Sequence, residues 1–120
     1  MIEVLLFDGD CAFCTSVADW MRRRLPPDVG VIPWQRAGDL SAYGLTAEEA
    51  SRAVYWIDAR GRAHRGHEAV IEALRGMGGV WERAGKAMAV EPVSAVAEAV
   101  YETVARNRHR LPGATPACRR

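Results

Sequence analysis

The first fourteen residues restrict the possible folds more than any other part of the chain. Residues 2–7 are nearly all apolar, as expected of a strand that is buried on both faces of a sheet. The acidic turn Asp8-Gly9-Asp10 ends this run, and Cys11 and Cys14 then open a segment with helical periodicity. A thiol at a helix N-terminus meets unpaired N–H groups and the positive end of the helix dipole, and both favour the thiolate. The segment therefore predicts a strand, a turn and a helix that carries a reactive cysteine.

Composition narrows the class of protein. With 120 residues, of which 49% are hydrophobic, the chain predicts one compact domain over 1–120 with a real core. The formal net charge of +1 gives no reason to expect nucleic-acid or membrane binding. No apolar run approaches the length of about 20 residues that a membrane span needs.

The cysteine content points to redox chemistry or to a metal. The first residues show no signal peptide, so we expect a cytoplasmic protein, and stable structural disulfides are uncommon in the cytoplasm. Three cysteines are also a poor structural framework. In such a setting a Cys-x-x-Cys pair indicates redox catalysis or metal binding.

The first half of the chain reads as alternating strands and helices. The first helix is expected from Cys11 to about Leu25, where Pro26-Pro27 stops it. Val29 to Trp34 predicts a second strand, parallel to the first through the helical crossover. Residues 37–44 suggest a loop, and Thr46-Ala47-Glu48-Glu49 matches a capping box for a short helix.

A hairpin and a further helix complete the predicted core. Arg52 to Ile57 is strand-like, residues 58–61 form a turn, and residues 62–65 return. A helix is expected from His67 to Met77. The order β-α-β-(α)-β-β-α, with a mixed sheet, is that of an α/β thioredoxin-like core over about residues 1–79.

The remaining residues predict a C-terminal helical extension. It covers about residues 80–110, an irregular tail follows over 111–120, and Pro92 is placed to start the last helix. The apolar stripe of this helix is predicted to pack on the core; its members are Val93, Val96, Ala97, Val100, Tyr101 and Val104.

Three ordered motifs resemble the DCC family of predicted thiol–disulfide oxidoreductases. The first is Asp8-Gly9-Asp10-Cys11-x-x-Cys14, and the second is Arg65-Gly66-His67-Glu68-Ala69-Val70, similar to the family's Arg-Gly-Ser-x-Ala-Val segment. The third is Val104-Ala105-Arg106-Asn107-Arg108 with Leu111 and Gly113. The resemblance implies a thioredoxin-like fold and a redox-active Cys-x-x-Cys, but no particular substrate. The chain departs from the family pattern at His67, where the family usually has serine. It also lacks the proline that thioredoxins place just before the strand that begins here at Arg52.

We assign catalytic roles to four residues of the opening motif. Cys11, at the exposed end of the helix, is predicted to attack a substrate disulfide. Cys14, one turn further in, is predicted to be more buried, to keep a higher pKa and to resolve the mixed disulfide. Asp8 either binds turn N–H groups or assists proton removal from Cys14. Asp10 disfavours a neighbouring thiolate, unless it caps the helix.

Phe13, Gly66 and His67 are the candidate substrate-binding residues. Phe13 is either a lip or core residue or a substrate contact, and His67 either starts a helix or stabilises the thiolate when protonated. We expect a disulfide-containing protein or a small thiol as substrate. Glutathione or thioredoxin would be the reductant, and no cofactor or metal is expected.

Three other functions were weighed against disulfide exchange. Cys11 and Cys14 would supply half of a zinc site, with Cys118 or a histidine completing it. A strand that ends in Asp-x-Asp also resembles the first motif of haloacid-dehalogenase-type phosphatases, but no acidic pair follows Lys86. The third alternative is a non-catalytic thioredoxin-like binding module that uses the basic residues Arg106, Arg108 and Arg110.

Overall fold

A four-stranded mixed sheet organises the computed structural model, which describes residues 3–110. The strand order is β2-β1-β3-β4; β1 pairs with β2 in parallel and with β3 antiparallel, and β3 and β4 form a hairpin. The prediction of an α/β fold with a mixed sheet is confirmed, and the arrangement is compatible with a thioredoxin-like fold. The strands are β1 (Val4–Phe7), β2 (Gly30–Pro33), β3 (Tyr55–Ile57) and β4 (Ala63–Arg65).

The central strand β1 is buried along its whole length and divides the core in two. Successive side chains of a strand point to opposite faces of the sheet. Val4 and Leu6 accordingly pack on one face with Leu45 and Ile57. Leu5 packs on the other face, in the cluster formed by Met21, Leu25, Trp56, Ala69 and Ala73. This two-sided burial explains the continuous apolar run in the sequence.

Local signals set the bounds of most helices. The helix α1 (Ala12–Arg22) begins directly after Cys11 and contains Cys14. The helix α2 (Ala47–Arg52) begins at the predicted capping box of Thr46 and Glu49. The helix α3 has the predicted bounds, His67–Met77. The loop expected over residues 37–44 contains a short 3₁₀ turn, η2 (Leu40–Tyr43), and another such turn, η1 (Trp34–Arg36), precedes it.

The helix α1 ends at Arg22, before the predicted end at about Leu25, and the start of β3 differs from the prediction because a cap governs it. The strand β3 begins at Tyr55, whereas Arg52 was expected to be its first residue. The capped helix α2 extends to Arg52 and shortens the strand. Gly66, which follows β4, has φ +63°, and an added Cβ there would lie 3.0 Å from the Tyr101 ring. The turn before α3 is therefore closely packed against the C-terminal part of the chain.

The β3–β4 turn is held by Asp58. One carboxylate oxygen accepts hydrogen bonds from the backbone N–H groups of Arg60 and Arg62, both at 2.9 Å, and the other lies 2.9 Å from His64 Nε2. The hydrogen bond with His64, followed by that with the Arg62 N–H, lowers the pKa of Asp58 to about 2. The carboxylate thus stays charged in the folded protein at pH values where it is protonated in the unfolded chain.

We expect the contribution of Asp58 to stability to be lost in acid. A lowered pKa stabilises the fold above the unfolded value of 3.8, and this stabilisation disappears as the pH falls through about 2. Urea unfolding of the wild type and of Asp58→Asn should therefore differ at pH 5, and the two should converge as the pH approaches 2. A difference that does not change over this range would contradict the assignment.

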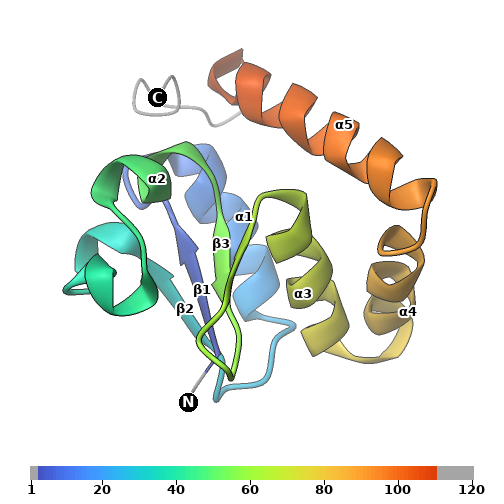
Figure 1. The fold of residues 1–120 in the computed structure, drawn as a ribbon, viewed down its shortest axis with the longest axis horizontal. Helices are drawn as coiled ribbons and strands as arrows, with labels where there is room; N and C mark the ends of the chain where they lie inside the picture. Colours follow the sequence, from blue (N-terminus) through green and yellow to red (C-terminus); the bar gives the residue numbers. More distant parts are fainter. Residues whose placement is uncertain (1–2, 111–120) are drawn as a thin grey trace.

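The C-terminal part of the described chain is helical, as predicted. It contains α4 (Gly79–Met88), α5 (Val93–Asn107) and the short η3 (Arg108–Arg110). The helix α4 is joined to α1 through an edge-to-face contact of Trp20 and Trp81, whose ring centroids lie 4.9 Å apart. The Arg24 guanidinium lies 4.0 Å from the Trp20 centroid and adds a cation–π contact. Figure 1 shows α5 running along the outside of the molecule, beyond α3 and α4.

The prediction that the α5 stripe packs on the core is wrong. Val96 is 62% exposed and Val100 is 57% exposed, and none of the helix's residues is fully buried. The helix is attached through longer side chains: the Tyr101 hydroxyl accepts a hydrogen bond from the Val54 N–H at 3.3 Å, and Arg108 reaches the backbone of Ser51. Because these side chains hold α5 away from the sheet, its small apolar residues line a space between them.

Candidate active site

A buried carboxylate organises the turn that precedes α1. Asp8 is only 3% exposed, and one of its oxygens accepts hydrogen bonds from the Asp10 N–H at 3.0 Å and from Gln35 Nε2 at 2.8 Å. The Gln35 side-chain oxygen in turn accepts from the Gly9 N–H at 3.0 Å. Asp8 therefore binds a turn N–H group, one of the two roles considered for it. Gln35, which sequence reasoning missed, supports the same turn from the end of β2.

Gly9 is required by a close approach of backbone and side chain. A Cβ added at Gly9 would lie 2.6 Å from the Pro33 Cβ, a distance that real Cβ atoms essentially never show. Only glycine lets the turn lie this close to the end of β2.

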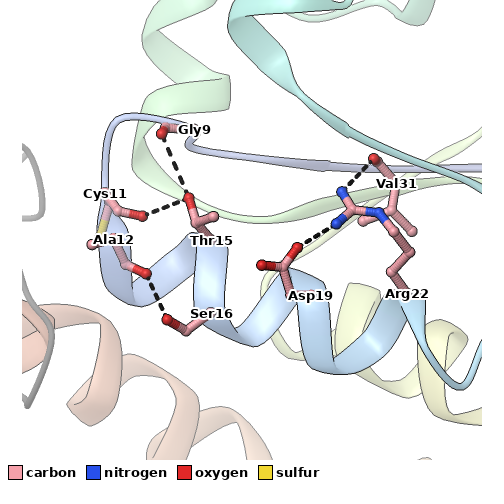
Figure 2. A network of polar contacts seen from close by, with 8 residues as sticks. All are labelled: Gly9, Cys11, Ala12, Thr15, Ser16, Asp19, Arg22 and Val31. Carbon is pink, nitrogen blue, oxygen red and sulfur yellow. Dashed lines mark hydrogen bonds and ion pairs between the residues drawn. The ribbon is translucent and has the colours of Figure 1, made fainter.

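Cys11 occupies the N-cap position of α1, immediately after Asp10. Its sulfur accepts a hydrogen bond from the Cys14 N–H at 3.5 Å, so it lies at the positive end of the helix. Figure 2 shows the hydroxyl bonds of the first turn, from Thr15 to the Cys11 carbonyl at 3.1 Å and from Ser16 to the Ala12 carbonyl at 3.0 Å. This turn brings Cys11 and Cys14 to within 3.4 Å of each other.

The predicted order of burial for the two cysteines is wrong. Cys11 is 0% exposed, whereas Cys14 is only partly buried. Cys11 lies at the N-cap, between the packed turn and the helix, while the first turn of α1 directs Cys14 toward the space under α5. Cys14 is a free thiol in the structure, so its sulfur is not joined to that of Cys11.

Arg108 brings a buried positive charge to the Cys14 sulfur. One guanidinium nitrogen donates a hydrogen bond to Cys14 Sγ at 3.2 Å, and the other donates to the Ser51 carbonyl at 3.2 Å. The residue is only 6% exposed. Sequence reasoning placed Arg108 in the C-terminal signature and in a basic cluster, but did not connect it with Cys14. That signature, which lies 94 positions beyond the cysteine, was the only signal available.

The environment of Cys14 has opposing effects on its pKa. Burial raises the pKa of the thiol and is the largest influence; the charge and hydrogen bond of Arg108 lower it, and the charge of Asp8 raises it again. The net effect is a raised pKa, as predicted for the cysteine one turn into the helix. Arg108 is thus the group that opposes the effect of burial on the pKa of this thiol.

The candidate substrate-binding residues separate into two groups. Phe13 and His67 line an apolar cavity of about 530 Å³, and Cys14 forms part of its wall. Gly66 is buried under Tyr101 and lines a different cavity of about 210 Å³, which His67 also borders. Asp10 is exposed at the turn. The structure therefore brings Phe13, His67 and Cys14 to one cavity.

The alternatives from the sequence find little support in the described part of the chain. Within residues 3–110, no group of three or more His, Cys, Asp or Glu side chains is placed to hold a metal ion. Cys118, the predicted additional zinc ligand, and the predicted tail 111–120 lie outside the described residues. Arg106 and Arg110 are exposed but Arg108 is buried, so the three arginines do not form one basic surface.

Comparisons with known proteins give a single match. A family described as DCC1-like thiol-disulfide oxidoreductase matches residues 5–114. No curated protein and no solved structure matches the chain. No helix in the part of the chain that the structure describes is long and apolar enough to cross a membrane.

Proposed function

The chain belongs to the DCC1-like thiol-disulfide oxidoreductase family, and we propose that it catalyses disulfide exchange through Cys11 and Cys14. The observation that carries the proposal is the first turn of α1. It holds Cys11 at the helix N-terminus, within 3.4 Å of a free Cys14 thiol that a buried guanidinium contacts. Proximity of two sulfurs and stabilisation of a thiolate are the two requirements of a dithiol redox centre.

The proposed reaction reduces a substrate disulfide and oxidises the dithiol. One cysteine attacks the substrate to form a mixed disulfide, and the other displaces the second substrate thiol as the Cys11–Cys14 disulfide forms. A low-molecular-weight thiol such as glutathione, or a thioredoxin-type protein, then restores the dithiol. We place this cycle in the cytoplasm, where such reductants are present. Asp8 keeps the turn in place, and Phe13 and His67 face the substrate.

A redox titration of the intact protein tests the proposal. Reduced, metal-free protein is equilibrated across a series of glutathione potentials, and the intact mass and free-thiol count are measured at each step. We expect a reversible mass loss of two hydrogens, which peptide mapping assigns to a disulfide between Cys11 and Cys14. The midpoint then gives the direction in which the protein transfers electrons.

A matched variant separates this couple from other pairings. Cys118→Ser leaves only Cys11 and Cys14 as thiols, so the loss of two hydrogens should persist with a similar midpoint. Cys14→Ser should abolish the Cys11–Cys14 couple. Thiols that never pair in the wild type, above all with one zinc bound per chain in the protein as purified, would exclude the oxidoreductase and support the metal site.

A further inference from the structure

The cavity under α5 is large enough for a small molecule and is almost entirely apolar. Its volume of about 530 Å³ lies within the range of about 300–1,000 Å³ that is usual for ligand sites. Side chains of α1, α3 and α5 form most of the wall, together with residues of the sheet and the loop before β3. The apolar members include Phe13, Val17, Met21, Val70, Val96, Ala97, Val100 and Val104.

The charged groups of the cavity accompany the sulfur. Asp8 and Arg108 are the acidic and basic residues of the lining, with His67 as a further titratable group. Arg108 contacts Cys14 directly, and the charge of Asp8 acts on the same thiol. A ligand with a charge on its body would lose hydration against the valines without gaining a partner there. Negative charge is favoured only next to the guanidinium, where sulfur bonds would form and break.

We propose that this cavity binds a small neutral disulfide with apolar substituents and presents it to Cys14, which is the attacking cysteine. This inference rests on the proposed function and specifies its substrate class. It reverses the roles expected from the sequence, because Cys14 forms part of the cavity wall whereas Cys11 is fully buried. Arg108 lies where the thiolate and the leaving sulfur carry their negative charge.

The steps balance with the dithiol as reductant. In the reduced protein, the Cys14 thiolate attacks one sulfur of the substrate, a Cys14–substrate disulfide forms, and the first thiol leaves as a thiolate that takes up a proton. The Cys11 thiolate then attacks Cys14 Sγ, and the second substrate thiol is released. One substrate disulfide becomes two thiols, and the protein dithiol becomes the Cys11–Cys14 disulfide. A cellular thiol of the glutathione class restores the dithiol.

The first test identifies the cysteine that forms the adduct. Cys11→Ser and Cys14→Ser are prepared in the Cys118→Ser background and incubated with dibenzyl disulfide, and the adducts are located by peptide mass. We expect Cys11→Ser to accumulate one benzylthio group on Cys14, and Cys14→Ser to accumulate little. A stable adduct on Cys11 in the Cys14→Ser protein, with none on Cys14 in its counterpart, would overturn the proposal.

The second test asks whether the cavity selects apolar substituents. Ala97 lines the cavity, whereas Ala99 lies on the same helix outside it, so Ala97→Phe and Ala99→Phe are matched variants. Reduction rates are compared for dibenzyl disulfide and for the polar bis(2-hydroxyethyl) disulfide. We expect Ala97→Phe to lower the dibenzyl rate by about tenfold or more, with little change for the polar disulfide, and Ala99→Phe to resemble the wild type. Val17→Phe repeats the experiment from α1 if Ala97→Phe does not fold.

The outcomes distinguish this inference from the proposed function. If the redox titration shows the Cys11–Cys14 couple but the wild type reduces neither disulfide, exchange stands and the substrate class proposed here is wrong. If the wild type reduces both disulfides, and Ala97→Phe lowers the two reduction rates equally or not at all, exchange stands but the cavity is not the substrate site. If Ala97→Phe lowers the reduction rate only for dibenzyl disulfide, the proposal is supported.

Discussion

An Arg108→Gln variant should react about tenfold or more slowly than the wild type at the Cys14 thiol near neutral pH. The guanidinium lies 3.2 Å from the sulfur and is almost fully buried, and hydrogen bonds to charged groups contribute about 1.5–3 kcal/mol. Burial, which raises the pKa of Cys14, would then be less strongly opposed, so the pKa should rise further. Less thiolate is present at a given pH, and the alkylation profile should move to higher pH.

The measurement is the rate of iodoacetamide alkylation between pH 6 and pH 10. It is made with Cys11→Ser and Cys118→Ser in the background, so that Cys14 is the only thiol. Arg106→Gln is the matched control, because Arg106 lies two residues before Arg108, near the end of α5, and is exposed. If the pH profile of alkylation for Arg108→Gln coincides with the profiles of the background protein and of Arg106→Gln, the guanidinium does not act on the sulfur.

A charge-retaining variant separates electrostatics from geometry. Arg108 donates from its two terminal nitrogens to different acceptors, Cys14 Sγ and the Ser51 carbonyl. Lysine keeps the charge but carries one ammonium group in place of the planar fork. Arg108→Lys should therefore keep part of the effect on the pH profile while losing some stability in urea.

The sequence was most informative where the determining signals are local. The buried strand β1, the capping box at Thr46 and the bounds of α3 follow from residues within one or two turns of each other, so the pattern predicted them. The contiguous turn and cysteines also predicted where the helix begins, but its cap is Cys11 and not Asp10, the residue considered for that role. These features depend on hydrogen bonds and periodicity that short segments contain in full.

The rest depends on contacts between distant segments. The Arg108 side chain meets Cys14 only because α5 crosses the molecule and ends above the first turn of α1. An apolar stripe such as that of α5 predicts burial, but it does not reveal whether side chains such as Tyr101 hold the helix away from the sheet. The cavity and the order of burial of the two cysteines both follow from this placement, and neither has a local signal.

The same long-range packing makes Trp56 the most sensitive position of the core. It is the largest of the fully buried side chains, with 1% exposure, and its Nε1 donates to Glu3 Oε2 at 3.0 Å. It belongs to the cluster that joins β1, α1 and α3, so its removal leaves a cavity beneath the helix that carries the cysteines. Large-to-small changes of buried aromatic residues cost about 3–5 kcal/mol.

Trp56→Ala should therefore lose about 3–5 kcal/mol of unfolding free energy, a large part of the total of about 5–15 kcal/mol for a typical domain. Urea unfolding of the reduced protein measures this loss. Trp56→Phe keeps a buried ring but leaves Glu3 without its N–H donor, so its loss should be smaller. Trp81→Ala is the matched control, because Trp81 is 37% exposed. This substitution should lower the unfolding free energy by less than Trp56→Ala does. Equal losses for Trp56→Ala and Trp81→Ala would contradict the view that the α1–α3 face of the sheet is the main support of the redox helix.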